Sequence, residues 1–180
     1  MCGTSQGEGL MIFCLDPGSS RIGWAIVDFD ETIVSLGSIG PGKGLGNNIP
    51  FNLKMNHIIK SLLDFYEDLL DNKDISHVAW EIVPSFGAMA QRELVQASAT
   101  TLKVLAFQRG LPYQQFTPRS WHKDFMGVAK VTKQEVKAKV LEHSKVLSPL
   151  PDDAPFDTYD AIAIGIMAAR KNKWIIDELL

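Results

Sequence analysis

Four acidic side chains stand beside apolar sequence, where a carboxylate charge is unfavourable unless it is paired or bound to a metal. Asp16 ends the run "MIFCLD" at a predicted strand tip, and Glu81 lies in the predicted strand "HVAWEIV" or at its tip. Asp157 and Asp160 are three residues apart in "PFDTYDAIAIG", which places both on one face at a helix start. Hard oxygen ligands suit Mg²⁺ or Mn²⁺, and a pair of such ions is a template for phosphoryl transfer.

Each of these acids also has an ordinary structural role open to it. Asp16 precedes Pro17 and Gly18 and could accept hydrogen bonds from the backbone of its own turn. Glu81 could face solvent or pair with an arginine, and the two later acids could cap their helix and interact with its dipole. The combination favours a metal site, because four oxygen donors occur together without a Cys or His cluster.

The elements that must position these acids begin with three short strands. Apolar runs on both sides of Pro17 and Gly18 predict a hairpin, and "TIVSLGSIG" extends it to a meander. "ISHVAWEIV" predicts a buried fourth strand and "LPYQQF" a fifth. The sequence therefore predicts a mixed five-stranded sheet, composed of a three-strand meander plus parallel strands.

Helical patterns alternate with the later strands. Thr132 and Glu135 form a capping box, which predicts a helix from there to about Val146. The other predicted helices are at 51–71, at 86–109, from Pro118 and from Phe156 onward. This order predicts an α/β fold with helices on both faces of the sheet.

The composition is that of one globular domain. Of 180 residues, 46% are apolar and 22% charged, and we expect a flexible tail at 1–10 and a single domain at 11–180. Two cysteines do not make a disulfide framework, and Cys14 is expected to be buried in a strand. Because a secretory signal and a bilayer-spanning run are missing from the sequence, we expect an intracellular, reducing location. It would be cytoplasmic or nucleoid-associated, with an organelle as the alternative.

Charge is distributed unevenly along the chain, although the net charge is only −3. Residues 28–81 contain nine acidic and four basic side chains, a balance of −5. Residues 103–145 contain nine basic and three acidic side chains, a balance of +6. One end of the molecule could therefore present a positive face to nucleic acid, or the basic run could be solvated helix surface.

The order of the acidic motifs resembles the RuvC family of Holliday-junction resolvases, which have a ribonuclease H-like fold. The resemblance rests on "DPGSSRIGWAIV", "VAWE" and "FDTYDAIAIG" and covers nearly the whole chain. It implies two Mg²⁺ ions, replaceable by Mn²⁺, held by catalytic residues Asp16, Glu81, Asp157 and Asp160. Asp16 would be the ligand shared by both ions. Some relatives have His at the position of Asp157, so Asp is a permitted variant there.

The resemblance implies an endodeoxyribonuclease that acts on branched DNA, chiefly four-way junctions. One ion would activate water for in-line attack while the other stabilises the leaving 3′ oxygen, which yields 5′-phosphate and 3′-hydroxyl ends. Because resolution needs two symmetric cuts, we expect a homodimer. Helix 86–109 has more apolar surface than one sheet face can cover, and its run "ASATT" would allow a second helix to approach. No feature of the sequence indicates a membrane or a motor partner.

DNA contacts are also predicted. The family's basic pair maps onto Lys133 and onto either His122 or Lys123, and an aromatic residue that probes the junction usually follows the strand glutamate by three positions. Here Pro84 occupies that place, so Phe86 either serves from a shifted position or packs in its helix. The full set of expected DNA-binding residues is Phe86, Arg119, His122, Lys123, Lys130, Lys133 and Lys137.

Three other functions remain open from the sequence. A RuvX-like nuclease or processing factor would have the same fold but a substrate other than a junction. An actin-like sugar kinase or chaperone ATPase has a phosphate loop similar to "LDPGSSRIG", but it needs two such lobes. A non-catalytic junction binder is disfavoured because all four acids are retained.

Overall fold

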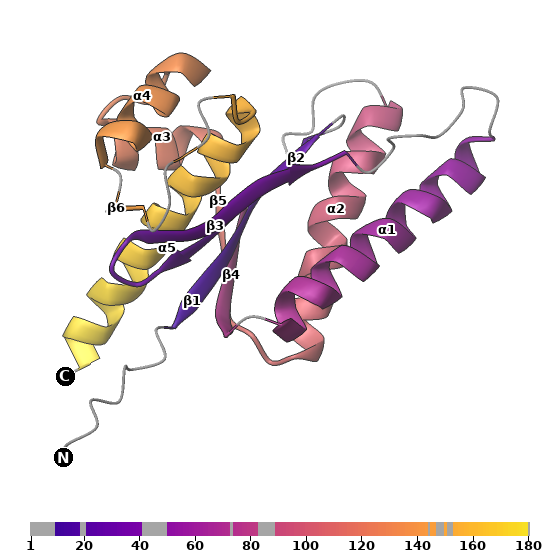
Figure 1. Cartoon of the computed structure of the whole chain (residues 1–180), viewed down its shortest axis with the longest axis horizontal. Helices are drawn as coiled ribbons and strands as arrows, with labels where there is room; N and C mark the ends of the chain where they lie inside the picture. The colour runs from indigo at the N-terminus through magenta and orange to yellow at the C-terminus, as the bar shows by residue number, and fades with distance from the viewer. Residues whose placement is uncertain are drawn as a thin grey trace.

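A mixed β-sheet forms the centre of the molecule, with helices on both of its faces (Figure 1). The computed structural model describes residues 10–18, 21–40, 50–72, 74–82, 89–143, 145–146, 150 and 153–179. The strands are β1 Met11–Asp16, β2 Ile22–Asp28, β3 Thr32–Ile39, β4 Ile75–Glu81, β5 Tyr113–Phe116 and β6 Lys145–Val146. The helices are α1 Phe51–Asn72, α2 Met89–Gln108, α3 Pro118–Met126, α4 Lys133–His143 and α5 Phe156–Leu179. Of the tail predicted at 1–10, only Leu10 lies within the described residues.

The strand order across the sheet is β5-β4-β1-β2-β3-β6. β1, β2 and β3 form the predicted antiparallel meander, and β4 and β5 join it in parallel on the β1 side. The α/β class, the five predicted strands and the helices on both faces are confirmed. One boundary is wrong: the helix expected to reach about Val146 ends at His143, and Lys145–Val146 pairs with β3 instead. That pairing satisfies backbone groups at an otherwise open sheet edge.

Side-chain alternation along β1 determines which residues face which helical layer. Phe13 and Leu15 pack in a cluster with α1 and α2, whereas Ile12 and Cys14 pack in a cluster with α3, α4 and α5. Because strand side chains alternate with a period of two, Asp16 belongs to the same face as Ile12 and Cys14. Cys14 is fully buried there, as expected, and burial raises the pKa of its thiol.

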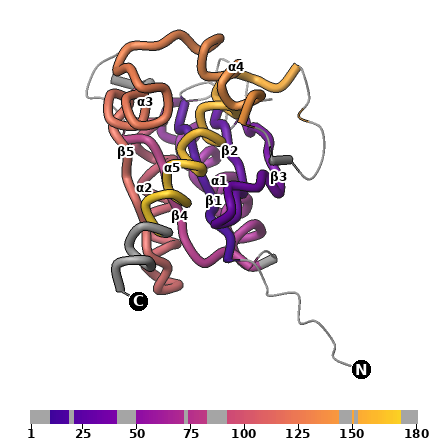
Figure 2. The backbone as a smooth tube through the Cα atoms, turned by 90° about the vertical axis from the view of Figure 1, so that its left-hand side faces the viewer, coloured from indigo at the N-terminus to yellow at the C-terminus, as the bar shows by residue number. Residues whose placement is uncertain are grey.

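The end of α5 near its first residue lies beside α3 and α4, as Figures 1 and 2 both show. The buried face of α5 runs across β1 and β2, and α3 and α4 pack on the same helix. α3, α4 and the first turn of α5 therefore form one corner of the molecule, over the β1 and β2 side of the sheet. No helix in the described part of the chain is long and apolar enough to cross a membrane.

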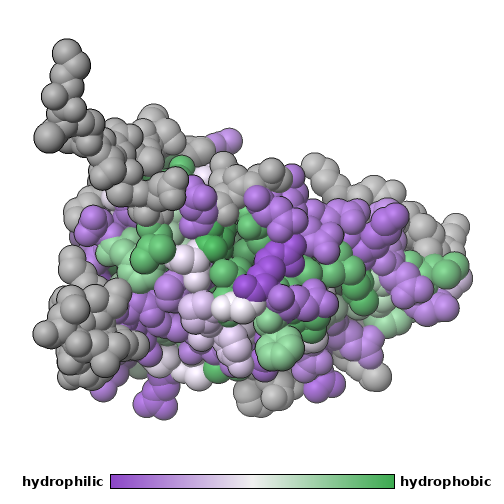
Figure 3. Space-filling model, turned by 90° about the horizontal axis from the view of Figure 1, so that it is seen from below, coloured by the Kyte–Doolittle hydropathy of each residue, from purple (hydrophilic) through white to green (hydrophobic). Residues whose placement is uncertain are grey.

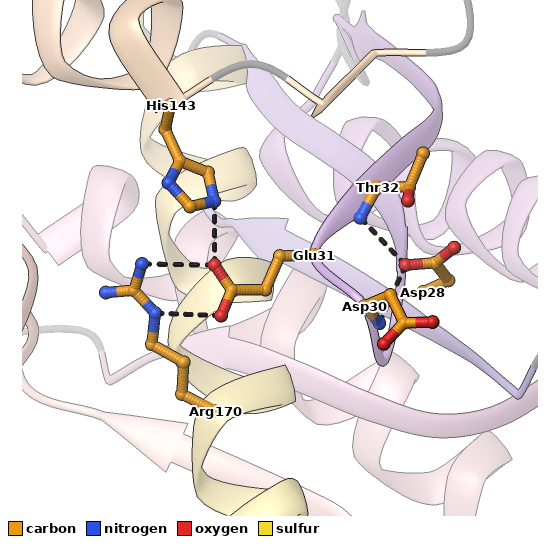
Figure 4. A network of polar contacts seen from close by, with 6 residues as sticks. All are labelled: Asp28, Asp30, Glu31, Thr32, His143 and Arg170. Carbon is orange, nitrogen blue, oxygen red and sulfur yellow. Dashed lines mark hydrogen bonds and ion pairs between the residues drawn. The ribbon is translucent and has the colours of Figure 1, made fainter.

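A network of polar contacts lies around the β2–β3 turn, at the end of the sheet away from the first turn of α5 (Figure 4). In the turn between β2 and β3, Asp28 Oδ1 accepts hydrogen bonds from the backbone of Asp30 and Thr32. Glu31, with φ of 67°, directs its carboxylate to Arg170 of α5 and to His143 at the end of α4. The network joins the β2–β3 turn to two helices that reach the acidic corner at their other ends.

On the face seen in Figure 3, apolar side chains reach the surface in separate areas among polar ones. The most exposed large apolar side chain of the described residues is Phe107 on α2, at 81% exposure. Val104 is 47% exposed and lies three residues earlier, on the same side of the helix.

Candidate active site

Asp16 and Glu81 end two neighbouring parallel strands. The register Leu15↔Trp80 brings the carboxyl ends of β1 and β4 to the same edge of the sheet. In β4, Ala79 packs on the α5 side and Trp80 on the opposite side, so Glu81 is directed toward α5 like Asp16. Two strands thus deliver two carboxylates to one corner.

The first turn of α5 reaches the same corner because Gly23 has no side chain. Gly23 pairs with Asp16 across β1 and β2, and a Cβ added to it would lie 1.9 Å from the backbone oxygen of Asp157. Thr158 Oγ1 also donates a hydrogen bond to the backbone oxygen of Gly37, at 3.1 Å. Close backbone packing therefore holds the start of α5 against the meander, next to Asp16.

This packing brings three of the four predicted ligands together. One carboxylate oxygen each from Asp16, Asp157 and Asp160 lies within 4.8 Å of the others. Glu81 is not part of this group. It does line a pocket of about 250 Å³ together with Asp16 and Asp160. Its Oε2 accepts a hydrogen bond from Trp121 Nε1 at 2.6 Å. All four acids thus converge on one corner, with Glu81 turned toward α3.

The electrostatics of the corner favour a bound cation. Burial raises the pKa of Asp16 well above its usual value, and the charges of Glu81 and Asp160 raise it further. Burial also raises the pKa of Glu81 to about 7, although the hydrogen bond from Trp121 opposes the shift. The pKa of Asp160 is raised by burial, against the effect of Lys133. Carboxylates that resist ionisation in this way gain from an added positive charge.

Lys133 supplies a positive charge at this place. Its Nζ donates a hydrogen bond to Asp157 Oδ1 and lies 3.2 Å from Asp160 Oδ2. Burial alone would lower the pKa of Lys133, but these carboxylates raise it above its usual value. Lys133 begins α4, where Thr132 and Glu135 form the predicted capping box. An ammonium group among these carboxylates shows that they attract cations, and their hard oxygen atoms fit Mg²⁺ or Mn²⁺.

The other predicted DNA-binding residues divide into three groups. His122 lines the pocket, whereas its alternative Lys123 is exposed and does not. Burial lowers the pKa of His122, although its hydrogen bond with the backbone of Ala129 and the charge of Asp160 oppose the shift. Arg119 and Lys130 are exposed outside the pocket lining, and Lys137 Nζ lies 5.1 Å from the ring centroid of Tyr159. Phe86 lies outside the described residues.

Trp121 is a site residue that sequence reasoning missed. It is 1% exposed and its ring packs in the cluster formed with α5, while its N–H reaches Glu81. The available signal was its position, because "PRSWHKDF" begins a helix directly after "YQQF" and therefore near the end of a neighbouring strand. A buried indole usually finds a partner for its N–H.

Comparison with known proteins agrees with this geometry. A sequence model described as "Crossover junction endodeoxyribonuclease RuvC" matches residues 12–168. The protein of that name from Helicobacter acinonychis is 29% identical over 167 residues, which are 90% of this chain and 98% of the relative. The one from Brucella ovis is 29% identical over 178 residues, 94% of this chain and 92% of the relative.

Solved structures with the same fold include a RuvC protein bound to a Holliday junction and a Holliday junction resolvase. RuvC of T. thermophilus in complex with a Holliday junction substrate has a TM-score of 0.72 at 17% identity, covering 92% of this chain and 96% of that one. The yeast mitochondrial Holliday junction resolvase Ydc2 has a TM-score of 0.62 at 15% identity, covering 96% and 85%. The likeness shows the ribonuclease H-like arrangement of the sheet and helices. With the match over residues 12–168, it establishes that this chain belongs to the RuvC family.

Proposed function

We propose that this protein is a metal-dependent endodeoxyribonuclease that resolves four-way DNA junctions. The observation that carries the proposal is the convergence of Asp16, Asp157 and Asp160 within 4.8 Å, beside Glu81, in a chain of the RuvC family. The family membership favours this function over a RuvX-like factor, an actin-like ATPase or a non-catalytic binder. Its DNA substrate implies an intracellular place of action.

The four acids would hold two Mg²⁺ ions, with Mn²⁺ as a substitute. Asp16, whose pKa is raised by burial and by the charges of all three other acids, would be the ligand shared by both ions. When bound, such ions polarise the scissile phosphate, stabilise the charge that develops on the attacking and leaving oxygens, and so permit hydrolysis to 5′-phosphate and 3′-hydroxyl ends. The chain's own residues orient the site: the two strand ends and the first turn of α5 hold the carboxylates. Residues of α3 and α4 line the pocket beside these carboxylates.

Lys133 is suited to a second role when DNA is present. Its side chain is about half exposed and lies at the mouth of the acidic corner, on the first turn of α4. With Asp157 and Asp160 engaged as metal ligands, its ammonium group would be free to bind the phosphate beside the cut. His122 of α3 lines the same pocket, so we infer that His122 and Lys133 are the family's basic pair, with Lys123 outside it. Arg119, Lys130 and Lys137 would extend the positive surface along the DNA.

A homodimer would place two such sites on one junction. Within the run "ASATT", Ser98 is buried and its Oγ lies 2.7 Å from Tyr66 Oη of α1, whereas Thr100 is exposed. Of the large apolar side chains described on α2, Val104 and Phe107 are the exposed ones, and Thr100 lies on the same side of the helix. We propose that these residues meet their symmetry mates across a two-fold axis, which exposed apolar patches of this kind commonly do.

Cleavage of a synthetic mobile four-way junction tests the proposed function. With 5′-labelled strands and Mg²⁺, we expect paired nicks at symmetric positions, ends that ligase can rejoin, and little cutting of linear duplex. Asp16→Asn should lower cleavage by several orders of magnitude while junction binding persists, because it removes a ligand without removing the DNA surface. Asp124→Asn, the same change at an exposed position of α3, is the matched control. Cleavage by Asp16→Asn at the parent rate would refute the assignment.

A further inference from the structure

The β5–α3 connection places an indole ring at the acidic corner. Phe116 ends β5 and pairs in register with Glu81, and the backbone N–H of Ile82 donates to the oxygen of Phe116 at 2.8 Å. Thr117 alone separates β5 from α3, and its Oγ1 accepts a hydrogen bond from the backbone of Ser120 at 3.2 Å. The first turn of α3 is therefore anchored beside the end of β4, and Trp121 follows directly.

Packing determines the direction of the Trp121 N–H. The ring is 1% exposed, belongs to the apolar cluster shared with α5, and meets the ring of His122 edge to face at 4.0 Å between centroids. An indole can only donate, and it donates here to a carboxylate, which makes the bond short and charge-assisted. Trp121 therefore holds one oxygen of Glu81 from a rigid position.

Glu81 needs such a partner more than the other acids do. The three aspartates have short side chains on closely packed elements, whereas Glu81 has one more rotatable bond and its carboxylate lies outside their 4.8 Å group. A flexible ligand has to be ordered before it can bind a metal, and a neighbouring hydrogen-bond donor supplies that order in advance.

We propose that Trp121 is a positioning residue for Glu81, holding one carboxylate oxygen so that the rest of the group is presented to a divalent metal ion. This inference rests on the proposed function, in which Glu81 is a metal ligand. Trp121 does not contact DNA in this role, because its ring is buried. Its contribution is to metal affinity and acts through the indole N–H.

Two variants separate the N–H from the ring. Trp121→Phe keeps an aromatic side chain but removes the donor, and 3-benzothienylalanine incorporated at position 121 keeps the shape of the indole with sulfur in place of the N–H. The matched control is Trp80→Phe. Trp80 is also 1% exposed and precedes Glu81 in the chain, but it packs on the other face of the sheet against Tyr113.

Mn²⁺ binding to the DNA-free protein is the first measurement, by electron paramagnetic resonance of the unbound ion. We expect both position-121 variants to bind Mn²⁺ about ten- to a hundredfold more weakly than the parent, and Trp80→Phe to bind it as the parent does. The Mn²⁺ concentration for half-maximal junction cleavage should rise by the same factor. The cleavage rate at saturating Mn²⁺ and the junction affinity in Ca²⁺ should change little, which a general loss of structure would not produce.

A double-mutant cycle tests whether the effect passes through Glu81. In a Glu81→Gln background, the benzothienylalanine replacement should have little further effect on Mn²⁺ affinity. The inference is overturned if the benzothienylalanine protein binds Mn²⁺ like the parent, or if the effect is undiminished without the Glu81 charge. Failure of the proposed function is distinguishable, because Asp16→Asn would then leave Mn²⁺ binding unchanged.

Discussion

Replacing Glu81 by Gln should stabilise the metal-free protein at neutral and alkaline pH. The folded-state pKa of Glu81 is raised to about 7 from an ordinary value of 4.5, chiefly by burial. Between these two values the folded protein retains a proton that the unfolded chain has released, so stability falls as pH rises. At about 1.4 kcal/mol for each pH unit between these two pKa values, the charged form of Glu81 lowers the free energy of unfolding by about 3 kcal/mol once the pH exceeds 7.

The substitution preserves the local contacts while removing the titration. A Gln side-chain oxygen can still accept the Trp121 N–H, so the variant retains that hydrogen bond. Removing the charge of Glu81 also eliminates one of the causes that raise the pKa of Asp16, which acts in the same direction. The free energy of unfolding of the variant should therefore exceed that of the parent by about 3 kcal/mol at pH 8 and by much less at pH 5.

Urea unfolding in EDTA, followed by circular dichroism from pH 5 to 8.5, measures this difference. For a domain of this size it corresponds to a rise in melting temperature of about 6 to 12 °C at pH 8. Glu135→Gln is the control, because hydrogen bonds from Thr132 lower the pKa of this exposed group and it stays ionised throughout the range. Its curve should run parallel to that of the parent. A Glu81→Gln curve that is also parallel would refute the electrostatic reasoning.

Four further outcomes are expected. Mg²⁺ should raise the melting temperature of the parent but not of Asp16→Asn, as scanning calorimetry with and without EDTA can show, since binding to the folded state alone stabilises it. Lys133→Met should bind Mn²⁺ more tightly without DNA, because an ammonium group that competes with the metal is removed. It should also bind junctions more weakly, and the slope of log affinity against log salt concentration should be smaller by about one, because one phosphate contact is lost. Unchanged junction affinity across a salt series would show that Lys133 contacts no phosphate. Gly23→Ala should lower the free energy of unfolding by about 1 to 3 kcal/mol, because its methyl group would displace the backbone of Asp157. The rate of junction cleavage should also fall, since Asp157 would be moved. A urea unfolding midpoint and a cleavage rate equal to those of the parent would contradict this. Phe107→Glu should be monomeric in sedimentation equilibrium while retaining the circular dichroism spectrum of a folded protein, because the change places a charge in the proposed interface. A parent protein that is itself monomeric at micromolar concentration, with and without junction, would rule out the proposed dimer.

Local periodicity explains why much of the fold and the placement of three of the clustered acids could be predicted. Alternation along "MIFCLD" places Asp16 at a strand end on a definite face, and a spacing of three places Asp157 and Asp160 on one side of a helix start. These patterns depend only on the geometry of a strand or a helix, so they can be recognised without knowing what packs against them. The capping box at Thr132 and Glu135 is of the same kind.

Contacts between distant segments could be decided only by the tertiary structure. The pairing of Lys145–Val146 with β3 needs an open sheet edge nearby, which the local sequence does not reveal, so a helix was predicted there. That His122 lines the pocket and Lys123 does not depends on how α3 is rotated against α5. The bond from Trp121 to Glu81 depends on the β4–β5 register, and the contact of Lys133 with Asp157 and Asp160 on the packing of α4. Such contacts depend on the relative placement of whole elements, which arises from burial of the core and not from the pattern within any one of them.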